Sequence, residues 1–278
     1  GYIYAEALKG LKGNKIIFPK VSVGATINVL MAAVLAKGTT EIYNVAKEPE
    51  IEDLGLCLRS MGAKIQGLGT NKILVEGVTK LKETNYKVMF DRIEVGTYAL
   101  AVAIAGGEIE LIGAEKKLLT FFLNVLESIG VDYIITENSI IFKRNSNSLN
   151  PVDIITEPYP GFPTDLQAQL MAVMSISNGT SVITESIFEN RFMHAPELIR
   201  MGAKIKLKGN SAIVEGVKKL KGAEVMATDL RASVSLILAG LVAEGVTNID
   251  RIYHIDRGYQ DIVKKLQFCG ANINKVEL

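Results

Sequence analysis

Internal repetition constrains the fold of this chain more than any other feature. Four times, a helix-like segment ends at a glycine before a strand-like segment, and a second helix-like segment ends at another glycine 23 to 25 residues later. The second glycines of successive pairs are 68 or 72 residues apart. Such regular spacing is typical of one structural unit repeated along a chain. The pairs are Gly38 and Gly62, Gly107 and Gly130, Gly179 and Gly202, and Gly245 and Gly270.

Each repeat is expected to run strand, helix, strand, helix, strand, usually with one more strand. The glycines suit the left-handed position that ends many helices. The first helix of every repeat is apolar on nearly all sides, which predicts that it is buried, whereas the second is amphipathic. The sequence therefore predicts an α/β fold with helices inside and sheets outside. The first helices are expected within 23–35, 97–104, 166–176 and 232–242.

Composition excludes several classes of protein. The net charge of +1 argues against a nucleic-acid or anionic-membrane partner, which would favour a basic excess. No run approaches the ~18 uncharged apolar residues of a transmembrane helix. The two cysteines, Cys57 and Cys269, are predicted to be buried thiols in a reducing, cytoplasmic setting. Because the only histidines are His194 and His254, no metal site is expected.

The two ends of the chain do not match the repeat. The first and third repeats finish with similar strands and basic tails, at 72–82 and 211–221. The chain opens at 2–12 with a similar tail that no repeat precedes, and it ends before any such tail. Because domains rarely begin with a strand that has no unit of its own, the sequence predicts a piece of a longer polypeptide.

Equivalent corners of the repeats concentrate the residues that could carry chemistry. Fourteen residues before each first glycine lie Gly24, Ile93, Asp165 and Arg231, where a strand is expected to give way to a helix. Free backbone N–H groups at such a turn favour anions. The carboxylate of Asp165 could cap its helix, which the local sequence favours, or could act as a general base. The guanidinium of Arg231 could bind a phosphate or carboxylate, or could pair with Asp229.

A second group of candidates lies farther along the third and fourth repeats. Arg191, Arg251 and Arg257 could extend an anion site, although each could equally be solvated or paired with an acid. His194 and His254 are predicted to be packed rather than catalytic, because neither has a nucleophile nearby to activate.

Five segments of the chain carry a specific combination of residues: 20–26, 162–169, 188–194, 227–232 and 253–259. Together they resemble one enzyme family, the enolpyruvyl transferases that act on UDP-N-acetylglucosamine. The resemblance covers the whole chain and implies domains built as pseudo-threefold, inside-out α/β barrels with helices inside and sheets outside. It implies that residues 87–278 are the C-terminal three-repeat domain and that residues 1–86 are the terminal part of the catalytic, N-terminal domain.

The resemblance also implies a reaction and roles for particular residues. The enolpyruvyl group of phosphoenolpyruvate would pass to the 3′-hydroxyl of UDP-N-acetylglucosamine with release of phosphate, the first committed step of peptidoglycan synthesis. Asp165 would take the hydroxyl proton, and Arg231 and Arg257 would hold phosphoenolpyruvate. The two substrates would be the only partners, with no cofactor, nucleic acid or membrane. The residues implied for the UDP-sugar are Lys20, Val21, Ser22, Val23, Asp165, Ile187 and Arg191.

One part of the family pattern is expected outside this chain. The family's mobile loop with its reactive cysteine would belong to a preceding N-terminal segment, and neither cysteine here matches it. The isolated chain is therefore expected to be inactive. Three alternatives stay open at this point: a shikimate-type enolpyruvyl transferase, a non-catalytic module that binds anions or nucleotide sugars, and a repeat scaffold for protein contacts.

Overall fold

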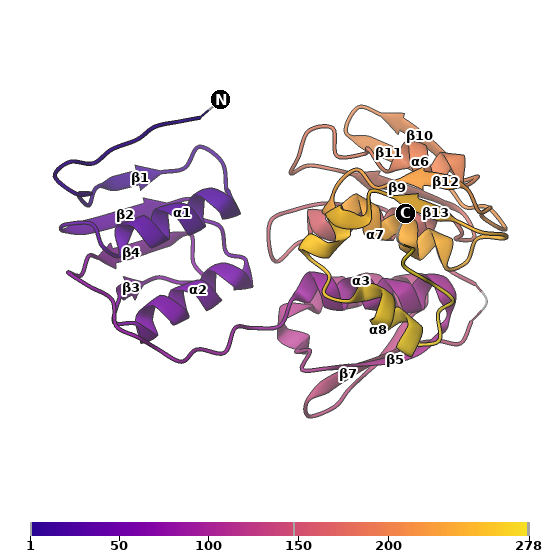
Figure 1. Ribbon diagram of the computed structural model, residues 1–278, viewed down its shortest axis with the longest axis horizontal. Helices are drawn as coiled ribbons and strands as arrows, with labels where there is room; N and C mark the ends of the chain where they lie inside the picture. Colours follow the sequence, from indigo (N-terminus) through magenta and orange to yellow (C-terminus); the bar gives the residue numbers. More distant parts are fainter. Residues whose placement is uncertain (1, 147, 277–278) are drawn as a thin grey trace. The chain divides into compact units, whose positions relative to one another are not determined.

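The computed structural model describes residues 2–146 and 148–276 and divides the chain into two compact units. Unit 1 comprises Gly1–Phe90 with Pro158–Pro160, and unit 2 comprises Asp91–Glu157 with Gly161–Leu278. Both combine helices with sheets (Figure 1). No helix within the described residues is long and apolar enough to cross a bilayer.

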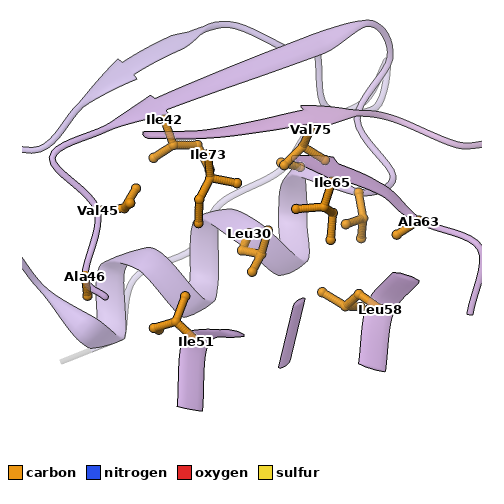
Figure 2. Packing of buried hydrophobic residues seen from close by; sticks show 12 residues of the cluster. Leu30, Ile42, Val45, Ala46, Ile51, Leu58, Ala63, Ile65, Ile73 and Val75 are labelled. Carbon is orange, nitrogen blue, oxygen red and sulfur yellow. The ribbon is translucent and has the colours of Figure 1, made fainter. Parts of the chain in front are cut away.

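Unit 1 holds one four-stranded sheet and two helices. Its strands lie in the order β1-β2-β4-β3, with β1 parallel to β2 and the remaining pairs antiparallel. Its core lies between the helices and the sheet, where Leu30 lies between Ile73 of β4 and Ile51 of α2 (Figure 2). The elements are β1 (Lys15–Ile17), α1 (Val23–Ala33), β2 (Thr39–Tyr43), α2 (Pro49–Ser60), β3 (Lys64–Gln66) and β4 (Lys72–Glu76).

The prediction that every first helix is buried is wrong for α1. Leu30 is completely buried, but Met31 is 44% exposed and Leu35, just beyond the helix, is 53% exposed. Among the described residues of unit 1, α1 packs mainly against α2 and β4, which cover one side of it.

Unit 2 contains the other three repeats. Its elements are α3 (Arg92–Ala105), β5 (Gly107–Ile112), the 3-10 helix η1 (Lys116–Leu118), α4 (Thr120–Ile129), β6 (Asp132–Ile135), β7 (Ser139–Arg144), β8 (Ile154–Ile155), the 3-10 helix η2 (Thr164–Leu166), α5 (Gln167–Met174), β9 (Thr180–Thr184), α6 (Ala195–Arg200), β10 (Lys204–Lys208), β11 (Ser211–Glu215), β12 (Glu224–Met226), α7 (Leu230–Gly240), β13 (Asn248–Asp250), the 3-10 helix η3 (Ile252–Arg257) and α8 (Ile262–Phe268).

The core of unit 2 is formed by its three first helices. Helices α3, α5 and α7 contact one another, and every residue of α5 is buried. The strands form three sheets, β5-β7-β6, β8-β9-β11-β10 and β12-β13. The order β8-β9-β11-β10 repeats the order β1-β2-β4-β3 of unit 1, with the same parallel and antiparallel pairs. The repetition expected from the glycine spacing is therefore present in the sheets.

Three expectations from the sequence are corrected here. Residues 77–91, between β4 and α3, contain no strand, and residues 271–276 after α8 are not a strand either. Neither segment is hydrogen-bonded along a neighbouring strand. The first and second glycines of the pairs have positive φ except Gly179, whose smallness instead makes room for the ring of Pro151. Cys269 is exposed and Cys57 is half-buried, so the prediction of two buried thiols is wrong.

Candidate functional site

The third repeat corner is built differently from the other three. At the residue two positions before each corner residue, Ser22, Asp91 and Asp229 accept backbone N–H bonds and cap their helices. The third repeat has Pro163 at this position, which offers no side-chain acceptor. The chain enters α5 through the 3-10 turn η2, and Asp165 lies within that turn.

The carboxylate of Asp165 therefore does not cap its helix, contrary to the interpretation that local sequence favours. Its Oδ1 accepts from Nη2 of Arg191 at 2.7 Å, and its Oδ2 lies 3.4 Å from Nε of Arg231. Arg231 does not pair with Asp229 through its guanidinium, since the carboxylate of Asp229 accepts from the backbone N–H of Arg231 instead. Two cations thus flank one carboxylate.

Arg191 is fixed from several sides. Its Nη1 donates to Oγ1 of Thr164 at 2.7 Å, and its guanidinium lies 4.7 Å from the ring centroid of Phe188. Thr164 in turn donates its proton to Glu185 at 2.8 Å. Sequence reasoning missed Thr164 and Glu185 as members of the site. The sequence places Thr164 beside Asp165, but no local pattern links either residue to Glu185.

Arg231 is the more buried of the two cations, with its side chain 15% exposed. Its guanidinium lies 5.5 Å from the ring centroid of Tyr259. Burial lowers the pKa of Arg231, but Tyr259 and Asp165 more than offset this effect, and the pKa is raised above its ordinary value. Its Nη1 is buried and has no hydrogen-bond partner among the described residues. A charged donor without an acceptor is costly, so a bound anion would satisfy it.

A buried hydrogen-bond network around Tyr259 contacts both Arg231 and Asp165. The hydroxyl of Tyr259 lies 2.9 Å from Oγ1 of Thr97 and 3.4 Å from Nε2 of Gln169. The same Nε2 donates to the backbone carbonyl of Asp165 at 2.9 Å. The network therefore links α3, α5 and the segment after η3 next to Asp165.

The other candidates of unit 2 lie outside this cluster. Arg257 and Arg251 are exposed in and beside η3, and within the described part of the chain neither makes a hydrogen bond or ion pair with Asp165. Ile187 is 37% exposed, and its backbone N–H donates to Glu185. Burial lowers the pKa of His194 to about 4, so this side chain is neutral and packed, as predicted.

Lys20, Val21, Ser22 and Val23 belong to unit 1. All four are exposed, and the side chain of Ser22 accepts from the backbone N–H of Ala25 at 3.2 Å to cap α1. The apolar side chains of Val21 and Val23 are 40% and 36% exposed. This segment thus offers one cation, one hydroxyl and apolar surface at the start of a helix.

The cluster around Asp165 can act chemically as a base beside an anion-binding group. A carboxylate can accept a proton from a hydroxyl, and the adjacent guanidinium groups can hold a phosphate or carboxylate. Among residues 2–146 and 148–276, no three His, Cys, Asp or Glu side chains are grouped so that they could hold a metal ion.

Comparison with known proteins identifies the family of the chain. The family model described as EPSP synthase (3-phosphoshikimate 1-carboxyvinyltransferase) matches residues 1–266. The chain is 58% identical over 277 residues to the UDP-N-acetylglucosamine 1-carboxyvinyltransferase of Dinoroseobacter shibae, covering 100% of this chain and 66% of that relative. It is also 58% identical to the enzyme of the same name from Agrobacterium fabrum, covering 99% of this chain and 64% of the relative. The chain thus spans just under two-thirds of the length of these relatives.

Solved structures give the same answer for the fold. The enolpyruvyl transferase NikO from Streptomyces tendae superposes with a TM-score of 0.83 at 27% identity, over 90% of this chain and 60% of that one. An EPSP synthase from Acinetobacter baumannii superposes with a TM-score of 0.70 at 21% identity, over 97% of this chain and 64% of that one. The second likeness concerns the fold alone.

These matches confirm the resemblance that the five sequence segments indicate. The chain belongs to the EPSP synthase family of enolpyruvyl transferases, and its relatives at 56–58% identity are UDP-N-acetylglucosamine 1-carboxyvinyltransferases.

Proposed function

We propose that this chain carries part of the active site of an enzyme that transfers the enolpyruvyl group of phosphoenolpyruvate to the 3′-hydroxyl of UDP-N-acetylglucosamine. Phosphate leaves, and the product enters peptidoglycan synthesis in the cytoplasm. The observation that carries the proposal is the carboxylate of Asp165 between the guanidinium groups of Arg191 and Arg231. The names of the relatives supply the substrate class.

Two members of the cluster, Asp165 and Arg231, act directly on the substrates in this reaction. Asp165 accepts the proton of the sugar hydroxyl, so that the oxygen can add to C2 of phosphoenolpyruvate while C3 gains a proton. The resulting adduct then loses phosphate from C2 and a proton from C3. Arg231 holds the anionic phosphoenolpyruvate, and its unpartnered Nη1 is the donor available for it. Arg257, which is exposed in η3, is the second proposed contact to this substrate.

The UDP-sugar is assigned to two groups of residues. In unit 2 these are Asp165, Ile187 and Arg191, and Ile187 offers an apolar side chain that is 37% exposed. In unit 1 they are Lys20, Val21, Ser22 and Val23, where a lysine stands just ahead of a helix N-terminus that favours an anion. A diphosphate needs such donors because its charge must be balanced when water leaves.

The domain organisation belongs to the same proposal. Residues 87–278 are the C-terminal domain, a pseudo-threefold inside-out α/β barrel with α3, α5 and α7 at its centre. Residues 1–86 are the terminal part of the catalytic domain. The mutual contacts of the three helices and the repeated strand order support this assignment.

The test is a coupled assay of phosphate release, with the protein expressed from its complete gene and phosphoenolpyruvate as donor. UDP-N-acetylglucosamine should support turnover, and shikimate 3-phosphate should not. An Asp165→Asn variant should lose activity by about 10²-fold or more, the size expected when a general base is removed. Turnover with shikimate 3-phosphate instead would favour the shikimate-type enzyme. Binding without turnover would favour a non-catalytic module.

A further inference from the structure

Glu185 is a buried carboxylate to which the proposed reaction gives no role. It follows β9 directly and is only 2% exposed, and it forms no ion pair within the described residues. An acid in such a position is costly unless every acceptor site is used. Here its oxygens accept from four donors, which are the hydroxyls of Thr156 and Thr164 and the backbone N–H groups of Ile187 and Phe188.

The bond from Thr164 sets the direction of a hydrogen-bond chain. The hydroxyl of Thr164 has a single proton, which it donates to Oε2 of Glu185 at 2.8 Å. Its oxygen is thereby left to accept from Nη1 of Arg191 at 2.7 Å. The other terminal nitrogen of Arg191 donates to Asp165 at 2.7 Å. Glu185 is thus linked to Asp165 through two intermediate side chains, those of Thr164 and Arg191.

The second oxygen of Glu185 acts on the opposite side of Arg191. Its Oε1 accepts from the backbone N–H of Ile187 at 2.9 Å and of Phe188 at 3.1 Å. These bonds fix the segment that carries the Phe188 ring, which lies against the Arg191 guanidinium. The hydroxyl of Thr164, which accepts from Arg191, and the ring of Phe188, on which Arg191 lies, therefore both depend on the carboxylate of Glu185.

We propose that Glu185 is a positioning residue, which orients Arg191 and thereby Asp165. It also shapes the segment 186–191, in which Ile187 and Arg191 are assigned to the sugar. The inference rests on the proposed function for its catalytic consequence. The two oxygens of Glu185 have separate effects: Oε2 acts on the base through Thr164, and Oε1 acts on substrate binding through the segment 186–191.

Substitutions can separate these two effects. Thr164→Val removes the hydroxyl that joins Oε2 of Glu185 to Arg191 and leaves the bonds to Oε1 in place. Glu185→Gln keeps one oxygen for the backbone N–H groups but offers Thr164 a donor instead of an acceptor, so it should resemble Thr164→Val. Glu185→Ala removes both. A matched control is Glu110→Gln, because Glu110 in β5 also accepts from a hydroxyl, that of Ser139 at 2.6 Å, on a different sheet.

The expected kinetic result is a split between kcat and KM. Thr164→Val and Glu185→Gln should each lower kcat about 10- to 100-fold, as expected for a misplaced reacting group, with the KM for UDP-N-acetylglucosamine changed little. The double variant, with Thr164→Val and Glu185→Gln together, should lower kcat no further than Glu185→Gln alone. Glu185→Ala should in addition raise that KM, and Glu110→Gln should behave as wild type. Unchanged kcat in either conservative variant, or multiplicative effects in the double variant, would overturn the proposal.

A second measurement separates this inference from the proposed function. In a ¹⁵N–¹H spectrum of the chain, the Nε–H signal of Arg191, assigned with Arg191→Lys, reports its fixation without any substrate. Glu185→Gln and Thr164→Val should accelerate its solvent exchange, while Glu110→Gln should not. If exchange is faster in these two variants but the wild type shows no turnover, the proposed function is refuted and the positioning role is kept. An Arg191 signal that is equally protected in all variants would refute the positioning role.

Discussion

Replacement of Gly216 by alanine tests how closely the segments of unit 2 pack. Gly216 follows β11, and a Cβ atom there would lie 1.7 Å from the backbone oxygen of Ser177 and 2.7 Å from its carbonyl carbon. Both atoms belong to main chain, so a side-chain rotation cannot relieve the overlap. The equivalent residue of unit 1, Gly77, would approach the backbone oxygen of Ala36 at 1.6 Å, so the close approach is a feature of the repeat.

The size of the effect follows from what must move. To reach ordinary contact, the two segments must separate by more than about 1 Å, which weakens the bonds from Gly216 N to Gly179 O at 2.9 Å and from Val217 N to Ser175 O at 2.8 Å. Two weakened hydrogen bonds between partly exposed backbone segments cost about 0.5–1.5 kcal/mol each, and overpacking adds about 1–3 kcal/mol. Alanine restores up to about 1 kcal/mol by restricting the unfolded chain. We expect the free energy of unfolding of unit 2 to fall by about 1–6 kcal/mol.

Urea denaturation followed by far-UV circular dichroism measures this loss. Gly240→Ala is the matched control, because a Cβ there meets only the side chain of Thr247 at 3.5 to 3.7 Å and the residue lies at the end of α7. The control should change the free energy of unfolding by less than about 1 kcal/mol, in the stabilising direction. A loss below about 1 kcal/mol for Gly216→Ala, or one equal to the control, would refute the close approach.

Three further outcomes are expected. Asp165→Asn leaves two guanidinium groups facing each other and should cost about 1–3 kcal/mol in urea denaturation at low salt and less at 1 M NaCl; an equal cost at both salts would contradict the ion-pair account. His194, with a folded pKa of about 4 and an unfolded pKa of about 6.5, adds stability that is complete above pH 6.5 and falls by about 3 kcal/mol towards pH 4. Denaturation from pH 4 to 8 should show a flatter profile for His194→Gln, and an unchanged slope would assign the loss to other groups. Tyr259→Phe removes the buried hydroxyl that is hydrogen-bonded to Thr97 and should lower the free energy of unfolding by about 1–2 kcal/mol. In a double-mutant cycle, this loss and the loss caused by Thr97→Val should add to less than their sum.

Much of the architecture can be predicted from short-range features of the sequence. Glycines such as Gly62 and Gly130 end helices because they adopt positive φ without strain, and that preference is local. The apolar runs of α5 and α7 predict buried helices because periodicity along a helix determines which sides can face water. The five family-like segments also lie in continuous stretches, so they can be recognised without knowing which segments meet.

The site depended on contacts that no local pattern contains. Asp165 is a residue type that often caps helices. Its carboxylate nevertheless reaches Arg191, which is 26 residues away, because Pro163 occupies the capping position of this repeat. Glu185 gives no signal in the sequence, since the hydroxyls of Thr156 and Thr164 that bind it lie 29 and 21 residues away along the chain. Periodicity and backbone preference act between near neighbours, and they specify the elements of this protein. The partners of a charged side chain depend on which elements pack together, so the arrangement around Asp165 had to be seen in three dimensions.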